Sequence, residues 1–238
     1  MKRTYGLASA LFGLVLMPGL ASAGTLEFDF LPANTFSGTA PAGSLTAVFT
    51  DNGDGTVNLK ITSSLATGEN LDPGKALYLN FKGDGAVTNA TKLSFSLVSN
   101  TNFSQAATVL TTSKEKDMNF KADGDGHYDI LFTYTSSTKA FTNGEIQTYK
   151  ISSTAGSISA SDFNELSEFP SGSGSWLAAV HVQNTPSGGS GSAFVGGTVP
   201  GGGGGGNIIP EPSSMALMGL GGLGLAGFLG RIRRKRLA

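Results

Sequence analysis

Apolar and polar residues alternate with a period of two along most of the chain. This alternation gives a β-strand one apolar and one polar face, and the Gly, Asp and Asn residues between the alternating segments favour turns. The pattern therefore predicts about eight to ten short strands. The clearest are residues 26–30, 45–50, 57–62, 77–81, 93–97, 130–134, 149–151 and 176–183.

Strands with one apolar face must bury that face against a second layer. Two antiparallel sheets packed face to face do this efficiently, as in jelly-roll folds. We therefore predict an all-β domain over residues 24–199, an antiparallel, jelly-roll-like β-sandwich. The only predicted helix is short. It runs from Asp162 to about Glu168, with Ser161 as its capping residue.

Residues 1–23 have the three zones of a secretory signal peptide. Two basic residues come first, an apolar run of eleven residues (7–17) follows, and a Pro-Gly pair then ends the run. Ala21 and Ala23 form the A-x-A pattern of a cleavage site. We expect export through the Sec machinery and cleavage after Ala23; the alternative is an uncleaved anchor helix.

The C-terminal region contains a second apolar segment. Ser213–Ile232 is twenty residues long, or about 30 Å as a helix, which matches a bilayer core. We predict one transmembrane helix here. Because basic residues stay cytoplasmic, the domain before the helix would lie outside the inner membrane. The basic residues at its end are Arg231, Arg233, Arg234, Lys235 and Arg236.

A Pro210-Glu211-Pro212 tripeptide stands directly before this segment. Each proline disfavours helix at the residue before it, so the tripeptide should stay extended and accessible to a peptidase. The succession of this tripeptide, an apolar helix and a basic tail resembles the PEP-CTERM sorting signal, here residues 210–236. The resemblance implies a bacterial, mostly Gram-negative, exported protein that is processed by exosortase, a membrane-embedded peptidase. An ordinary membrane anchor is the alternative.

The stretch between the domain and this signal is rich in glycine. Six consecutive glycines fall within residues 200–209, which we predict to be a linker because glycine cannot pack a core. Residues 50–56 and 176–183 also resemble stretches that recur in PEP-CTERM proteins with a β-rich domain. This second likeness supports the β-rich prediction and implies no site residue.

Charge is distributed unevenly along the chain. The whole chain has a net charge of −1, but residues 24–206 hold nine lysines, no arginine and sixteen acidic residues, a balance of −7. An acidic domain does not favour nucleic-acid binding. The absence of cysteine excludes disulfides and thiolate metal sites, and we predict no cofactor. The absence of arginine disfavours planar, bidentate recognition of acidic sugars.

One loop is a candidate calcium site. Asp123, Asp125 and Asp129 are spaced so that their oxygens could surround Ca²⁺, but the loop lacks the acidic twelfth residue of an EF-hand. The alternative is ordinary turn chemistry, since Asp and Gly favour hairpin turns. We expect the same turn chemistry for Asp51, Asp54 and Asp84.

Three further groups of side chains could bear on function. Asp162, Glu165 and Glu168 recur every third residue, which suggests either an acidic helix face or a pair for glycoside hydrolysis. His181 lies on a predicted strand, where we expect a structural role. Exposed aromatic rings on a β-domain could stack on sugars; the candidates are Tyr78, Tyr128 and Trp176.

We therefore expect an exported, non-enzymatic protein with a structural or adhesive role in an exopolysaccharide or biofilm matrix. It would be anchored in the inner membrane before processing and then reach the cell surface or the extracellular matrix. A surface carbohydrate-binding protein is the first alternative. A secreted glycan-active enzyme is the second.

Overall fold

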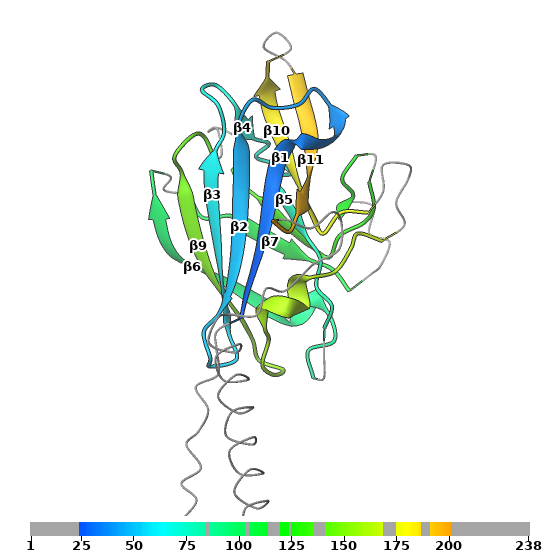
Figure 1. Cartoon of the computed structure of the whole chain (residues 1–238). Helices are drawn as coiled ribbons and strands as arrows, with labels where there is room; N and C mark the ends of the chain where they lie inside the picture. The colour runs from blue at the N-terminus through cyan, green and yellow to red at the C-terminus, as the bar shows by residue number, and fades with distance from the viewer. Residues whose placement is uncertain are drawn as a thin grey trace, which may run out of the picture.

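The computed structural model describes residues 24–83, 86–102, 105–113, 120–123, 125–135, 141–168, 175–186 and 191–200. These residues form one all-β body, and the order of its elements is shown in Figure 1. The strands are β1 (Thr25–Gly38), β2 (Ser44–Asp51), β3 (Val57–Ser64), β4 (Asn70–Leu71), β5 (Leu77–Leu79), β6 (Leu93–Thr101), β7 (Thr108–Thr111), β8 (Ile130–Thr133), β9 (Ile146–Ser153), β10 (Ala178–Thr185) and β11 (Gly191–Thr198).

All these strands belong to one antiparallel sheet with the order β6-β9-β3-β2-β1-β11-β10-β5-β8-β7, and β4 pairs with β10. The all-β, antiparallel prediction is confirmed, whereas the prediction of two separate sheets in a jelly-roll-like sandwich is corrected. The sheet stays continuous because the long strand β1 pairs with both β2 and β11. Its register with β11 shifts twice between Phe30 and Ser37, and such irregularities let a strand bend.

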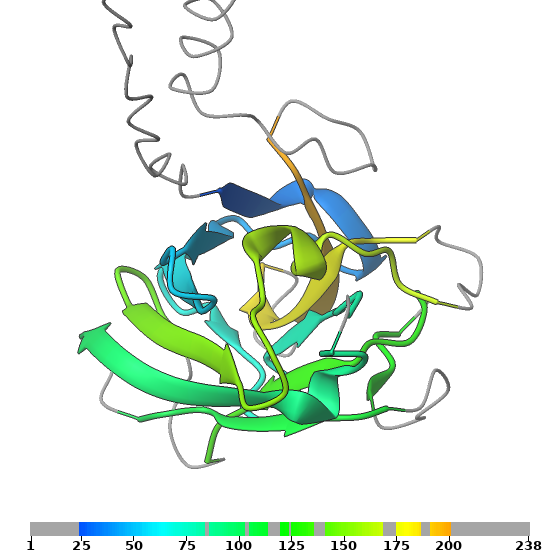
Figure 2. The ribbon, with the colours of Figure 1, turned by 90° about the horizontal axis from the view of Figure 1, so that it is seen from below.

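The sheet curls until it is nearly barrel-shaped (Figure 2). Its end strands, β6 and β7, are consecutive in the chain. Side chains join the two ends across the interior: Phe95 of β6 meets Phe132 of β8 edge to face at 5.6 Å. The Ala107 N–H donates to the Tyr149 hydroxyl at 2.8 Å, and that hydroxyl donates to Gln147 Oε1 at 2.6 Å. The Tyr149 hydroxyl at this seam thus both accepts and donates a hydrogen bond, whereas the buried Gln105 Oε1 beside it has no partner among the described residues.

The interior is filled by the apolar faces that the alternation predicted. Phe28, Phe49 and Leu59 are 0% exposed, and each comes from a different strand. Complete burial of such a side chain contributes about 1.5–3 kcal/mol. The two phenylalanines meet edge to face with ring centroids 5.7 Å apart. The period-two pattern therefore identified the inward face of these strands.

The helix predicted over Asp162–Glu168 is instead the short 3₁₀ helix η3 (Ala160–Phe163). It begins after Ser159 rather than Ser161. The Ser159 N–H donates to the Asp162 carboxylate at 2.8 Å, as part of a capping box. Phe163 anchors the helix by stacking on Phe49 at 4.4 Å. The helix lies across one end of the curled sheet in Figure 2, and residues 164–168 after it are not helical.

Strand β11 was missing from the sequence prediction, yet it lies in the middle of the sheet between β1 and β10. Two adjacent glycines break its alternation. A Cβ at Gly196 would come within 2.0 Å of the Trp176 ring, and one at Gly197 within 2.8 Å of the Phe30 ring. Glycine is needed here because rings pack directly on the backbone of the strand.

A second apolar cluster covers part of the outer face of the sheet, and we call it the outer layer. It consists of Tyr78, Phe120, Ala122, Tyr128, Leu131, Ala179 and Phe194. Trp176 was predicted inside a strand but lies before β10, where it stacks on Phe36 at 6.0 Å. The outer layer packs beside His181, whose ring stacks on Phe194.

Candidate functional site

The predicted end signals lie outside the described residues. This applies to Ala21 and Ala23 of the signal peptide and to the Pro210-Glu211-Pro212 tripeptide. It also applies to the predicted span Ser213–Ile232 and to the basic residues Arg231, Arg233, Arg234, Lys235 and Arg236. In the part of the chain that the structure describes, no helix is long and apolar enough to cross a membrane.

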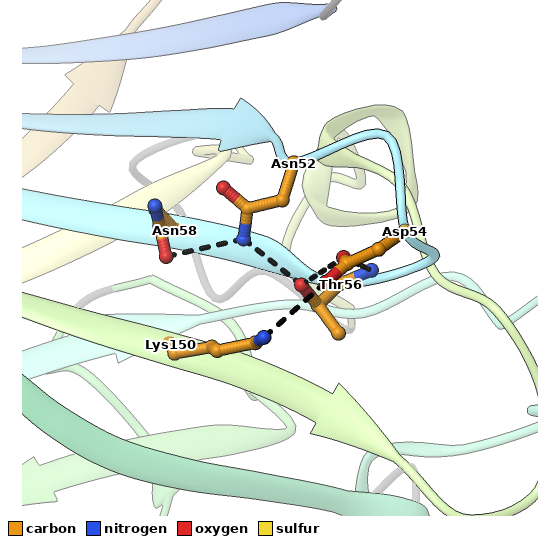
Figure 3. A network of polar contacts seen from close by, with 5 residues as sticks. All are labelled: Asn52, Asp54, Thr56, Asn58 and Lys150. Carbon is orange, nitrogen blue, oxygen red and sulfur yellow. Dashed lines mark hydrogen bonds and ion pairs between the residues drawn. The ribbon is translucent and has the colours of Figure 1, made fainter.

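The turn between β2 and β3 shows the chemistry expected for Asp-Gly turns. Asp54 accepts a hydrogen bond from the Thr56 N–H at 3.0 Å and another from the Thr56 hydroxyl. Lys150 Nζ lies 3.3 Å from its carboxylate (Figure 3). These contacts, the Thr56 hydroxyl first, lower the pKa of Asp54. Gly53 and Gly55 have positive φ angles of 75° and 80°, which glycine adopts readily.

The three calcium candidates have separate partners in this structure. Asp123 accepts from the Ser37 hydroxyl at 3.2 Å at the surface, and Asp129 accepts from the Phe81 N–H at 3.0 Å. Asp125 is 0% exposed. Among the described residues, no three His, Asp or Glu side chains form a group that could hold a metal ion. The geometry gives the calcium hypothesis no support, and it stays a prediction.

Asp125 is the centre of a buried polar network beneath the outer layer. The Tyr128 hydroxyl donates to its Oδ2, and the Ser167 hydroxyl donates to its Oδ1 at 2.8 Å. Burial raises the pKa of Asp125 above its usual range, against the lowering effect of these hydrogen bonds. Burial, followed by the nearby carboxylate, also raises the pKa of Tyr128. These contacts tie the segment at Ser167 to the loop at Asp125.

The acidic triplet does not form a helix face. Asp162 caps η3, whereas Glu165 and Glu168 follow the helix. Lys82 Nζ lies 3.7 Å from the Glu165 carboxylate, and both side chains are exposed. The His127 N–H donates to the Glu168 backbone carbonyl at 2.7 Å. Glu165 and Glu168 do line one open pocket of about 280 Å³, but Asp162 is not part of it.

Two of the three aromatic candidates for sugar stacking are buried. Tyr78 is 0% exposed and Tyr128 is 2% exposed. Their rings lie 5.5 Å apart within the outer layer. Trp176 is partly exposed, and stacking on Phe36 at 6.0 Å covers part of its ring. Of the three, only Trp176 has ring surface available to a ligand.

His181 has a partner that the sequence did not indicate. Its Nδ1 lies 2.8 Å from Asp72 Oδ2. Its ring stacks on Phe194 at 4.1 Å with an interplanar angle of 1°. Burial lowers the pKa of His181, and Asp72 opposes that shift. The Asp-Pro-Gly-Lys run that begins at Asp72 predicts a turn, but nothing local in the sequence shows that this turn meets β10.

Comparison with known proteins bears on the C-terminal region. Residues 209–235 match the family model described as the PEP-CTERM protein-sorting motif. The chain carries a PEP-CTERM sorting motif. This match confirms the resemblance based on the tripeptide, the apolar segment and the basic tail. No curated protein and no solved structure matches the chain.

The PEP-CTERM motif bears on where the protein goes. It implies export toward the cell surface and processing by exosortase, which is a membrane protein. The motif thus supports an exosortase-sorted extracellular surface protein. The described β-rich residues all precede the motif in the chain.

Proposed function

We propose that the β-rich domain works outside the cell as a non-enzymatic structural or adhesive component of an exopolysaccharide or biofilm matrix. The observation that carries this proposal is the PEP-CTERM motif at residues 209–235. The fold is compatible with it, since the curled sheet buries its apolar faces without disulfides. Such a domain would keep its shape in any redox compartment.

The order of events before delivery is part of the proposal. Residues 1–23 would direct the chain of a Gram-negative bacterium into the Sec machinery and then be cleaved after Ala23. Ser213–Ile232 would hold it in the inner membrane with the basic tail in the cytoplasm. Exosortase would then act near the Pro-Glu-Pro tripeptide, and the linker over residues 200–209 would keep that site clear of the domain.

Sorting is tested by replacing Pro210, Glu211 and Pro212 together with alanine in the native host. The variant should accumulate as the unprocessed, membrane-bound form and be lost from the cell surface. A matched control replaces Asn207 and Ile208, which lie in the predicted linker just before the motif at residues 209–235, with alanine. Processing of the tripeptide variant at the wild-type rate would contradict the sorting route.

The matrix role needs a separate experiment. Deletion of the gene should weaken the cohesion of the matrix without changing the amount of polysaccharide secreted, and the wild-type chain should restore it. Complementation by the tripeptide variant should fail, because its domain stays at the membrane. Unchanged cohesion in the deletion strain would overturn the structural or adhesive role and leave the sorting route standing.

Carbohydrate binding at the surface is the second candidate function. It is favoured by one specific observation, an open pocket of about 440 Å³ beside His181. Pockets of this size are typical of small-ligand sites. A glycan array probed with the full-length chain in detergent should then show selective binding, whereas a purely structural protein should bind no glycan selectively.

A further inference from the structure

The open pocket beside His181, which we call the His181 pocket, is built from three distant parts of the chain. Its described lining consists of Asp72, Lys75, Lys121, Asp123, His181 and Phe194. The first two come from a loop between β4 and β5, the next two from the segment that covers the outer face, and the last two from β10 and β11. Convergence of charged side chains from separate elements is typical of a binding site.

The loop at Asp72–Ala76 interrupts what would otherwise be one strand. Both β4 and β5 pair with β10, and His181 is the β10 residue opposite the interruption. The His181 carbonyl accepts from the Asp72 N–H at 2.8 Å, and the His181 N–H donates to the Ala76 carbonyl at 3.2 Å. Interruptions of a ladder often re-aim side chains next to functional sites. Here the loop places the Asp72 side chain next to His181 and Lys75 at the pocket.

The carboxylates of the pocket are already engaged. Asp72 Oδ1 accepts from the Gly74 N–H at 2.8 Å, and its Oδ2 faces His181. Asp123 accepts from the Ser37 hydroxyl at 3.2 Å. An ionised carboxylate accepts about four hydrogen bonds, so both keep lone pairs for further donors.

The ammonium groups of the pocket are in the opposite situation. Neither Lys75 nor Lys121 lies in an ion pair with any residue that the structure describes. Two cations that have no ion-pair partner among the described residues, at one pocket of an otherwise acidic domain, favour a ligand with a negative group. Lysine binds a carboxylate as a point charge and needs no planar geometry, so the absence of arginine is no obstacle here.

A buried donor next to the pocket adds an independent observation. The Tyr78 hydroxyl is buried and has no hydrogen-bond partner among the described residues. The Tyr78 ring lies 6.3 Å from the ring of Phe194, which lines the pocket, and burial raises the pKa of Tyr78. Leaving such a group unpaired is destabilising, so it calls for an explanation other than packing.

We infer that the His181 pocket binds a sugar acid, which carries one carboxylate and several hydroxyl groups. Lys75 and Lys121 hold the carboxylate, and the remaining lone pairs of Asp72 and Asp123 accept from the hydroxyls. His181, fixed by Asp72 and by its stacking on Phe194, forms the floor. The inference rests on the proposed matrix role only for its source of ligand, the uronate units of an extracellular polysaccharide.

The test is a calorimetric titration of the full-length chain in detergent with glucuronate, with glucose and acetate as comparators. Glucuronate should bind saturably. Glucose and acetate should bind at least about tenfold more weakly, because glucose lacks the carboxylate and acetate lacks the hydroxyl groups. Lys75→Met and Lys121→Met should each weaken glucuronate binding by about tenfold, the effect of losing one charge-assisted contact of about 1.4 kcal/mol. Lys60→Met is the matched control, since Lys60 is exposed on β3 and should bind glucuronate like the wild type.

Four other outcomes would each overturn the inference in a distinct way. Equal binding of glucose would make the pocket a neutral-sugar site, and equal binding of acetate a simple anion site. An equal loss in Lys60→Met would show non-specific charge attraction, and no heat with any of the three would mean no sugar-acid site. Saturable glucuronate binding in a protein whose deletion leaves matrix cohesion unchanged would defeat the matrix role and leave the pocket standing.

Discussion

The two faces of the sheet are packed by different rules. The inner face is filled with fully buried apolar side chains, and its seam polar groups Tyr134, Gln147 and Tyr149 are hydrogen-bonded to one another. The outer layer also buries aromatic rings, but it encloses the Asp125 carboxylate and leaves the Tyr78 hydroxyl unpaired among the described residues. The inner face is thus dominated by apolar packing, whereas the outer layer combines aromatic packing with a buried carboxylate.

The largest effect should come from the inner face. Phe28→Ala removes a fully buried ring that packs against Phe49, and we expect a loss of about 3–5 kcal/mol in the free energy of unfolding. Urea denaturation measures it. Leu31→Ala is the control, since Leu31 is 43% exposed and lies on the same strand. A loss below about 1 kcal/mol for Phe28→Ala would remove the distinction between the faces.

The glycine beneath Trp176 tests how tightly the outer side packs on β11. In Gly196→Ala the new Cβ would lie 2.0 Å from the indole, so the ring must move, at a cost of about 1–3 kcal/mol. Trp176 is the single tryptophan of the chain, and its fluorescence should shift to the red. Gly74→Ala is a matched control, because a Cβ there meets only Asp72 Oδ1, at 3.5 Å. An unshifted spectrum would contradict this packing.

The buried carboxylate tests whether polar groups in the outer layer matter for stability. Asp125→Ala leaves the Tyr128 and Ser167 hydroxyls without their acceptor, and we expect a loss of about 1–3 kcal/mol. The double variant Asp125→Ala with Tyr128→Phe should recover part of it, because one orphaned donor is removed. Thermal unfolding of both variants gives the comparison. Additive losses would show that the two groups are not coupled.

His181 should give the smallest effect, a pH dependence. Its pKa is lowered in the folded state by burial, so the unfolded chain binds more protons between that pKa and the ordinary value near 6.5. Stability should therefore fall as the pH drops through this window, by no more than about 1.4 kcal/mol per pH unit for one proton. His181→Gln should flatten the slope in urea titrations at several pH values. An identical pH dependence of stability in His181→Gln and the wild type would contradict this role of His181.

The accuracy of the sequence-based prediction differs between elements. Strands β1, β2 and β3 were recognised because each buries one face, so their alternation is intact. Strand β11 was missed because Gly196 and Gly197 lie where rings approach its backbone. The helix after Ser161 was misplaced because the capping box starts two residues earlier, at Ser159. The first failure has a tertiary cause, because distant rings pack on β11, whereas the second is a choice between two nearby serines as the cap.

The sequence by itself determined the sorting motif, the alternating strands and the acidic, cysteine-free character of the domain, because each is a property of a continuous segment or of composition. Only the tertiary structure decided that the strands form one curled sheet and that Asp72 meets His181. It also decided that Tyr78 and Tyr128 are buried. Pairing partners are chosen among many alternating strands of similar pattern, so the choice depends on the packing of the whole domain.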